Sequence, residues 1–180
     1  MKQMNKTDVF RFDRTLAFMS RFIGKEERIL DLGTPNQLSE FLEKNQFKVQ
    51  SAFGFDFDMD PGRINQYDYD VLTAFEVIEH LVSPFPLLRE TKARKLVVTV
   101  PLKLWFAKAF RNVKDPRDQH YHEFESWQLD MLLEKAGWEV KACEKWVPPF
   151  QPAGLRSVLR AVTPRFYAVY AERKFELCIE

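Results

Sequence analysis

The sequence predicts one domain of the α/β class, in which helices flank a mostly parallel β-sheet. Two observations lead to this prediction. The apolar residues that follow Tyr69 form a run too short for a typical helix, which suits a strand buried on both faces of a parallel sheet. The stretch then changes to helical spacing, with Val77, Leu81 and Val82 on one predicted helix face. A chain of 180 residues is long enough for one domain with a sizeable core.

Composition excludes some classes of protein. A hydrophobic content of 46% argues against disorder, and a net charge of +1 gives no overall attraction to nucleic acid or to a membrane surface. Between Arg89 and Arg117 there are nine basic residues and two acidic ones, which indicates either an anion-attracting rim or a solvated face. Cys143 and Cys178 lack metal-type spacing and are expected to be reduced and structural. Without a signal peptide or about 18 consecutive apolar residues, we expect a cytoplasmic protein with no membrane span.

The first third of the chain contains two predicted helices and two predicted strands. Residues 1–24 include a leading amphipathic helix that ends at Gly24. Residues 28–32 form a strand that leads to Gly33, after which Thr34 caps a helix and Pro35 occupies its first turn. Residues 47–53 form the next strand.

The run FDFDMD at residues 55–60 alternates aromatic or apolar residues with aspartates, which predicts a short strand with one polar face. A calcium loop of the EF-hand type is excluded, because Pro61 and Tyr67 stand where that loop needs glycine and glutamate. Only about ten residues separate this run from Tyr69, so the helix that usually connects such strands is shortened or absent.

The remaining elements follow from similar patterns. A helix starts at Ser83-Pro84, and residues 95–101 form a strand. The aromatic and basic segment after it is either a substrate-contacting segment or a surface helix with Trp105 and Phe106 packed inward. A helix through Trp127 ends at Gly137, and strands follow at 138–147 and 165–171. Residues 148–164, between these strands, form an insertion with a short basic helix.

The stretch Y-D-V-L-T-A-F-E-V-I-E-H-L at 69–81 resembles the fourth strand and turn of the class I S-adenosylmethionine-dependent methyltransferases. D-L-G at 31–33, V-V-T-V-P at 97–101 and the H-x-H-x-F pattern at 120–124 resemble the same family, and the resemblance extends from about Arg28 to Lys174. It implies a single-domain, Rossmann-like methyltransferase fold closed by a C-terminal antiparallel hairpin. It also implies that residues 102–122 form a variable lid, and that the leading helix covers either the cofactor or simply the core.

The resemblance assigns cofactor contacts to six residues of this chain. Near the methionine end of S-adenosylmethionine lie Asp31, Gly33 and Thr34, although Thr34-Pro35 replaces further glycines that the family normally has. An acid after the second strand, Asp56 or Asp58, would hold the ribose. Phe75 and Glu76 would lie near the adenosine and the sulfonium.

The signature E-x-x-E-H at 76–80 is similar to that of two metal-dependent O-methyltransferase groups. One acts on catechols in ubiquinone biosynthesis, and the other on the terminal ribose diol of small RNAs. The similarity implies a Mg²⁺ or Mn²⁺ ion held by Glu76, Glu79, His80 and His122, with His80 and His120 as catalytic residues; His120 could take the place of His122. The alternative is a metal-free turn whose histidine orders the loop or touches the substrate.

The expected function is therefore S-adenosylmethionine-dependent O-methylation of a small molecule, either anionic or diol-bearing. Two alternatives remain open. The chain could be a non-catalytic binding or regulatory protein of the same fold, given its glycine-poor loop. It could also be a metal-dependent RNA 2′-O-methyltransferase, but the near-neutral charge and the lack of a recognised RNA-binding module argue against a nucleic acid partner.

Overall fold

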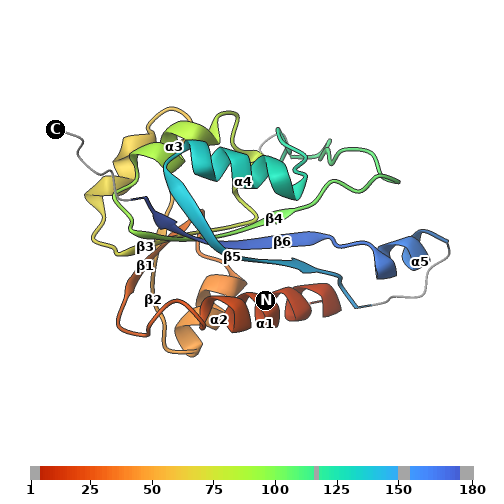
Figure 1. The fold of residues 1–180 in the computed structure, drawn as a ribbon, viewed down its shortest axis with the longest axis horizontal. Coiled ribbons are helices and arrows are strands. Elements are labelled where there is room, and N and C mark those ends of the chain that lie inside the picture. The colour runs from red at the N-terminus through yellow and green to blue at the C-terminus, as the bar shows by residue number, and fades with distance from the viewer. Residues whose placement is uncertain (1–4, 116–117, 150–154, 175–180) are drawn as a thin grey trace.

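The computed structural model describes residues 5–115, 118–149 and 155–174, and shows a six-stranded sheet between two layers of helices (Figure 1). The strand order is β2-β1-β3-β4-β6-β5. Neighbours among the first four strands pair in parallel, whereas β6 pairs antiparallel with both β4 and β5. The predicted α/β fold with a C-terminal hairpin is confirmed. The strands are β1 (Arg28–Leu32), β2 (Lys48–Ala52), β3 (Val71–Phe75), β4 (Lys95–Pro101), β5 (Trp138–Trp146) and β6 (Phe166–Arg173).

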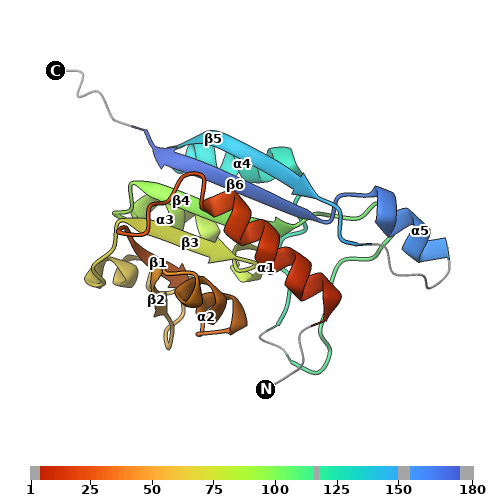
Figure 2. The ribbon, with the colours of Figure 1, turned by 90° about the horizontal axis from the view of Figure 1, so that it is seen from below.

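Helices cover both faces of the sheet. One face carries α1 and α2, and Figure 2 shows α1 lying across it. The other face carries α3 and α4, while α5 lies beyond one end of the sheet. The helices are α1 (Lys6–Met19), α2 (Gln37–Lys44), α3 (Pro84–Glu90), α4 (Ser126–Lys135) and α5 (Leu155–Val162), with 3₁₀ helices η1 (Pro61–Gln66) and η2 (Ile78–His80). The predicted shortening between β2 and β3 is confirmed, because only η1 occurs there.

The two helical layers explain why the central strands are apolar without interruption. Along β4, Leu96 and Val98 pack in the cluster beneath α3 and α4, while Val97 packs with α1 and α2. Both faces of this strand are therefore buried, which removes the alternation typical of a half-exposed strand. None of the described helices combines the length and apolar composition needed to cross a bilayer.

Both N-terminal helix predictions need correction. The first helix is capped by Asn5 and ends at Met19, five residues before Gly24. The second is capped by Asn36 rather than Thr34, because the Asn36 Oδ1 atom accepts hydrogen bonds from the amides of Leu38 at 2.8 Å and Ser39 at 3.2 Å. Asparagine is among the best residues at this position, since its short side chain satisfies amides that lack a partner within the helix.

The predicted strand at residues 55–60 is wrong. The chain forms turns there, since the Asp56 Oδ1 atom accepts from the Asp58 amide at 2.9 Å and the Asp56 carbonyl accepts from the Asp60 amide at 3.0 Å. These local bonds replace the pairing that a strand would need. The aromatic residues of the run are half-buried instead, and pack against the core from a loop.

The helix predicted to follow β3 is also wrong in part. Glu76 has a φ angle of +58°, and only the single turn η2 follows it. Ser83 precedes Pro84 and has a ψ of 80°, outside the helical range that a following proline disfavours. Helical structure therefore resumes only at α3, and the two glutamates of E-x-x-E-H do not share a helix face.

The segment after β4 contains no helix within its described residues. Trp105 is 75% exposed, so the alternative of a surface helix with Trp105 packed inward is wrong. The segment returns to the sheet at Phe124, which bridges to Leu102. Cys143 is free and exposed, while Cys178 lies outside the described residues.

Arg173 joins α3 and α4 at the end of the sheet opposite the carboxyl ends of the parallel strands. Its guanidinium donates to the carbonyls of Thr91 at 2.6 Å and Ala136 at 3.0 Å, and lies 4.0 Å from the Trp138 ring centroid. Replacing Arg173 with alanine is expected to lower the free energy of unfolding by about 2–3 kcal/mol, because both carbonyls lose a charged donor. Urea denaturation measures this; the neighbouring Lys174→Ala variant should change stability by less than about 0.5 kcal/mol.

Candidate functional site

The carboxyl ends of β1, β3 and β4 meet at one edge of the sheet, where ligands bind in open α/β folds. Gly33 turns the chain away from β1 with a φ angle of +108°, which strongly favours glycine. Its amide donates to the Ala52 carbonyl at the end of β2, at 2.9 Å. The turn is thus fixed by the sheet itself. Thr34 is exposed on this turn.

Asp31 lies just beneath this turn and is only 2% exposed. The Thr73 hydroxyl on β3 donates to its Oδ1 atom at 2.7 Å. Desolvation raises the pKa of Asp31 to about 7, against the opposing effect of that hydrogen bond. Asp31 therefore ties β1 to β3 underneath the predicted cofactor turn.

The two candidate ribose ligands have different surroundings. The Asp58 carboxylate accepts hydrogen bonds from the amides of Val82 at 2.9 Å and Ser83 at 2.7 Å, so it holds the entry to α3. Asp56 is exposed, and only its Oδ1 atom is engaged, in the turn described above. Asp56 is thus the freer of the two carboxylates.

Glu76 stands at the tip of β3 beside a cation from α1. Its amide donates to the Thr99 carbonyl at 2.9 Å, which fixes the left-handed residue to β4. One carboxylate oxygen lies 3.6 Å from Arg11, and the other is buried without a hydrogen-bond partner. Burial raises the pKa of Glu76, and the positive charge of Arg11 opposes this shift. Phe75, before it, is half-buried against the α1 and α2 cluster.

Glu79 is the most deeply buried acid at this edge, at 1% exposure. Its Oε2 atom has no hydrogen-bond partner. Desolvation, followed by repulsion from Glu76, raises the pKa of Glu79 to about 9. Its main-chain carbonyl accepts from the amides of Tyr121 at 2.8 Å and His122 at 3.2 Å, which ties η2 to the segment that precedes α4.

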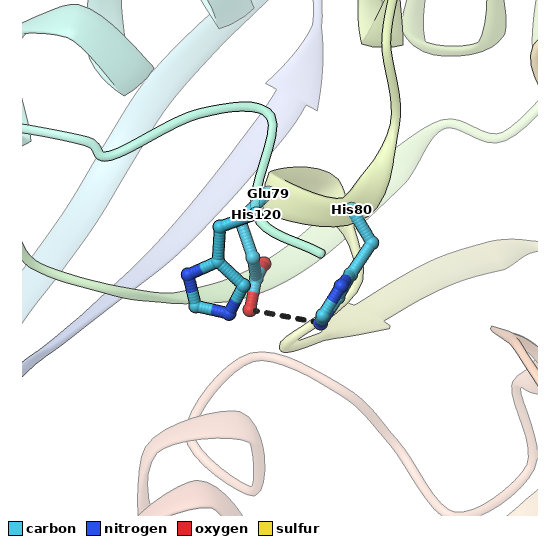
Figure 3. A group of neighbouring side chains, drawn as sticks. All are labelled: Glu79, His80 and His120. Atoms are coloured by element: carbon cyan, nitrogen blue, oxygen red, sulfur yellow. Dashed lines mark ion pairs between the residues drawn. The ribbon is translucent and has the colours of Figure 1, made fainter. Parts of the chain in front are cut away.

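His80 and His120 adjoin the Glu79 carboxyl group (Figure 3). Their rings are 4.8 Å apart and nearly perpendicular, and one potential ligand atom from each of the three residues lies within 4.8 Å of the others. The Nδ1 atom of His80 lies 2.9 Å from the Gln119 carbonyl, so it carries the proton and leaves Nε2 with a lone pair. Burial and the proximity of His80 lower the pKa of His120. The group offers two imidazoles and one carboxylate, a donor set suited to a divalent transition metal.

The comparison with known protein families then decides the identity of the fold. Residues 7–142, more than half of the chain, match the family described as a methyltransferase domain. The chain belongs to this methyltransferase family. It is a class I methyltransferase, which uses S-adenosylmethionine as the methyl donor.

Solved methyltransferase structures share this fold. That of an Archaeoglobus fulgidus S-adenosylmethionine-dependent methyltransferase has a TM-score of 0.58 at 18% identity, covering 92% of this chain and 94% of that one. Magnesium protoporphyrin IX methyltransferase of Synechocystis has a TM-score of 0.60 at 12% identity, with 97% and 90% covered. The Burkholderia thailandensis 1,6-didemethyltoxoflavin-N1-methyltransferase has a TM-score of 0.59 at 14% identity, with 93% and 81% covered. No curated protein sequence matches the chain.

The structure brings together a different group of potential metal ligands from the one that the sequence suggests. His122 donates from Nε2 to the Val82 carbonyl at 3.2 Å, and its ring stacks on Phe124. It therefore lies outside the group within 4.8 Å, as does Glu76, and His120 stands with Glu79 and His80 instead. His120 and His122 are only two residues apart, and the backbone conformation of the loop determines which of them lies beside Glu79.

Arg11 is a site residue that sequence patterns do not single out. It reaches the tip of β3 from α1, and the Nε atom of its guanidinium is buried without a hydrogen-bond partner. The alternation of aromatic and charged residues at 10–13 is the only signal in the sequence, and it is also typical of an ordinary amphipathic helix.

Proposed function

We propose that this methyltransferase transfers a methyl group to an oxygen atom of a small molecule, and that Glu79, His80 and His120 hold a Mg²⁺ or Mn²⁺ ion. One observation carries the proposal: a buried carboxyl group with an unpartnered oxygen lies beside two imidazoles at the edge of the sheet. A buried carboxyl group without a hydrogen-bond partner is costly, which argues for a ligand that completes it.

The residues present fit both the methyl donor and a metal ion. The Gly33 turn leaves the backbone open to close approach, and Asp56 is available for the ribose hydroxyls. For the metal, the Nε2 atom of His80, 3.9 Å from Glu79 Oε1, and the Oε2 atom of Glu79 would be ligand atoms, while the Gln119 carbonyl orients the His80 ring. Glu76 is excluded from this set by its pairing with Arg11.

Methyl transfer from a sulfonium requires alignment more than covalent help from the protein. S-adenosylmethionine supplies the electrophilic methyl group, and a bound divalent ion would lower the pKa of an acceptor hydroxyl. Burial and the proximity of His80 lower the pKa of His120, which favours the neutral imidazole that a metal ligand must be. The acceptor hydroxyl, acidified by the ion, would release its proton to solvent.

A small-molecule acceptor agrees with the structural relatives. Two of them are named for small heterocyclic acceptors, 1,6-didemethyltoxoflavin and magnesium protoporphyrin IX. The family match favours an enzyme over a non-catalytic binding protein of the same fold. Transfer to oxygen is supported by the carboxylate and imidazole set, since hydroxyl groups gain most from a metal ion.

Calorimetric titration with S-adenosylhomocysteine, with and without Mn²⁺, tests the proposal. We expect micromolar binding in both conditions, because the Gly33 turn is formed without a metal. Mn²⁺ should then be required for methyl transfer to catechol, with at least about 100-fold less transfer in excess chelator. If S-adenosylhomocysteine does not bind in either condition, the cofactor assignment is contradicted. Transfer that is equally fast in chelator would contradict the metal assignment alone.

A further inference from the structure

A cavity of about 730 Å³ opens beside the carboxyl end of β4, a size suited to a small organic ligand. Four separate segments form its walls: the chain that leaves β4, the start of α4, the end of β5 and the residues just before β6. The segments that leave β4 and precede β6 are those with the least regular structure near this edge. The lining residues on which the argument depends are Leu102, Lys103, Trp105, Phe124, Trp127 and Lys145.

The walls of this cavity are unusually aromatic for an exposed surface. Trp105 is 75% exposed and Trp127 is 55% exposed, while Phe124 lies buried between the loop and α4. The other two tryptophans, Trp138 and Trp146, are fully buried. Exposed indole rings around one cavity favour a flat, apolar ligand that can stack on them.

The charge of the cavity is positive. Lys145 lies 5.8 Å from the Tyr167 ring and has no carboxylate within ion-pair distance among the described residues. Among the described residues that line the cavity Glu125 is the only acid, and it accepts a hydrogen bond from the Trp127 indole at 3.0 Å and caps α4. It lies 3.9 Å from Lys103, at the limit of an ion pair. Two ammonium groups are therefore available to one anionic group.

A short stretch of chain connects the cavity to the group of Glu79, His80 and His120. The amide of Tyr121 is bonded to the Glu79 carbonyl, and three residues later the Phe124 carbonyl accepts from the Lys103 amide at 2.8 Å. An extended stretch of this length spans about 10 Å. A ligand in the cavity can therefore reach the edge where the methyl group is delivered.

We propose that this cavity binds the methyl acceptor, and that it selects a flat aromatic molecule with a carboxylate. The rings would lie between Trp105 and Trp127, and the carboxylate would pair with Lys103 and Lys145. This assignment rests on the proposed methyl transfer to a small molecule, and adds the chemical class of that molecule.

Fluorine NMR of protein labelled with 5-fluorotryptophan tests the proposal without any need for turnover. The four tryptophans give four signals, which Trp105→Phe and Trp127→Phe variants assign. The probe is 3-hydroxy-2-naphthoate, and the matched neutral ligand is its methyl ester. We expect the carboxylate to shift the Trp105 and Trp127 signals, to leave those of the two buried tryptophans in place, and to bind at least about tenfold more tightly than the ester.

The double variant Lys103→Gln/Lys145→Gln should remove this preference for the carboxylate, while Lys141→Gln on the same strand β5 should retain it. Lys141 is a suitable control because it pairs with Glu139 and does not line the cavity. Equal affinity for acid and ester in the unmodified protein would overturn the charge selection. Shifts confined to the buried tryptophans, or no binding, would overturn the site. Binding of S-adenosylhomocysteine, measured on the same sample, separates these failures from failure of the cofactor assignment.

Discussion

Replacing Glu79 with glutamine is expected to lower kcat for Mn²⁺-dependent methyl transfer by at least about 100-fold. Glutamine has nearly the shape of the protonated carboxyl group, but it cannot supply the anionic oxygen that a divalent ion prefers. The affinity for S-adenosylhomocysteine should stay within about threefold, because Gly33 and Asp56 are unchanged. Steady-state kinetics and calorimetry on the same preparation measure both effects. Glu134→Gln, at the exposed far end of α4, is the control.

The same substitution should stabilise the metal-free protein at high pH. The folded protein keeps a proton on Glu79 up to about pH 9, whereas the ordinary pKa of a glutamate in the unfolded chain is near 4.5. Between these values the folded state binds more protons, so stability falls as the pH rises. Glutamine removes this loss. The two proteins should melt alike below pH 4.5, and the variant should melt several degrees higher at pH 8.

Two results would contradict this account of Glu79. Full activity of the glutamine variant with Mn²⁺ would exclude the carboxyl group as a metal ligand. A melting temperature of the unmodified protein that Mn²⁺ does not raise at pH 8 would exclude a site at this edge, because an ion that binds only the folded state must stabilise it.

Replacing Gly33 with alanine is expected to weaken binding of S-adenosylhomocysteine by at least about tenfold. A Cβ atom at this position has room, since the nearest side-chain atom, Cγ2 of Val77, would be 3.8 Å away. The difficulty is the backbone, whose φ of +108° costs an alanine about 1–3 kcal/mol. The turn should therefore move, and with it the amides beside the cofactor. Calorimetric titration measures the affinity, and urea denaturation measures the stability.

Gly137→Ala is a matched control for this substitution. Its φ of +92° imposes a similar strain, but it lies after α4, at the opposite end of the sheet. It should lower stability by a similar amount and leave the cofactor affinity unchanged. If both variants lose affinity equally, the loss reflects general destabilisation, and Gly33 has no special role at the cofactor.

The strands could be predicted from sequence because a strand buried on both faces is an uninterrupted run of apolar residues. The bounds of β4 agree with the apolar run at 95–101, and β1 agrees with 28–32. The errors occur where short polar side chains redirect the backbone. Asp56 converts an alternating run into a turn, and Asp58 holds the start of α3 from a distance of more than 20 residues. Such bonds depend on the fold that is already formed, so periodicity does not reveal them.

The site could be predicted only in part, for a related reason. Glu79 and His80 are adjacent in sequence and follow a well-marked strand, so their placement at the edge could be inferred. The choice of His120 over His122 depends on two main-chain bonds to the Glu79 carbonyl. The contact between Arg11 and Glu76 depends on how α1 crosses the sheet. Local sequence contains neither fact.

The Tyr121 and His122 amides donate hydrogen bonds to the Glu79 carbonyl. These bonds divide the long connection between β4 and α4 into two parts that are anchored differently. The part from residue 119 to Phe124 is fastened at both ends, to η2 and to Lys103. The part from Trp105 to Asp115 rests on the fastened part, through the bridge from Arg111 to Gln119 and the Phe110 ring 4.5 Å from the His120 ring. Substitutions at the exposed residues before Phe110 should leave the histidines in place, whereas changes at Phe110 and Arg111 should not. The acceptor preference of the enzyme can thus change through side chains such as Trp105, without rebuilding the centre where the methyl group moves.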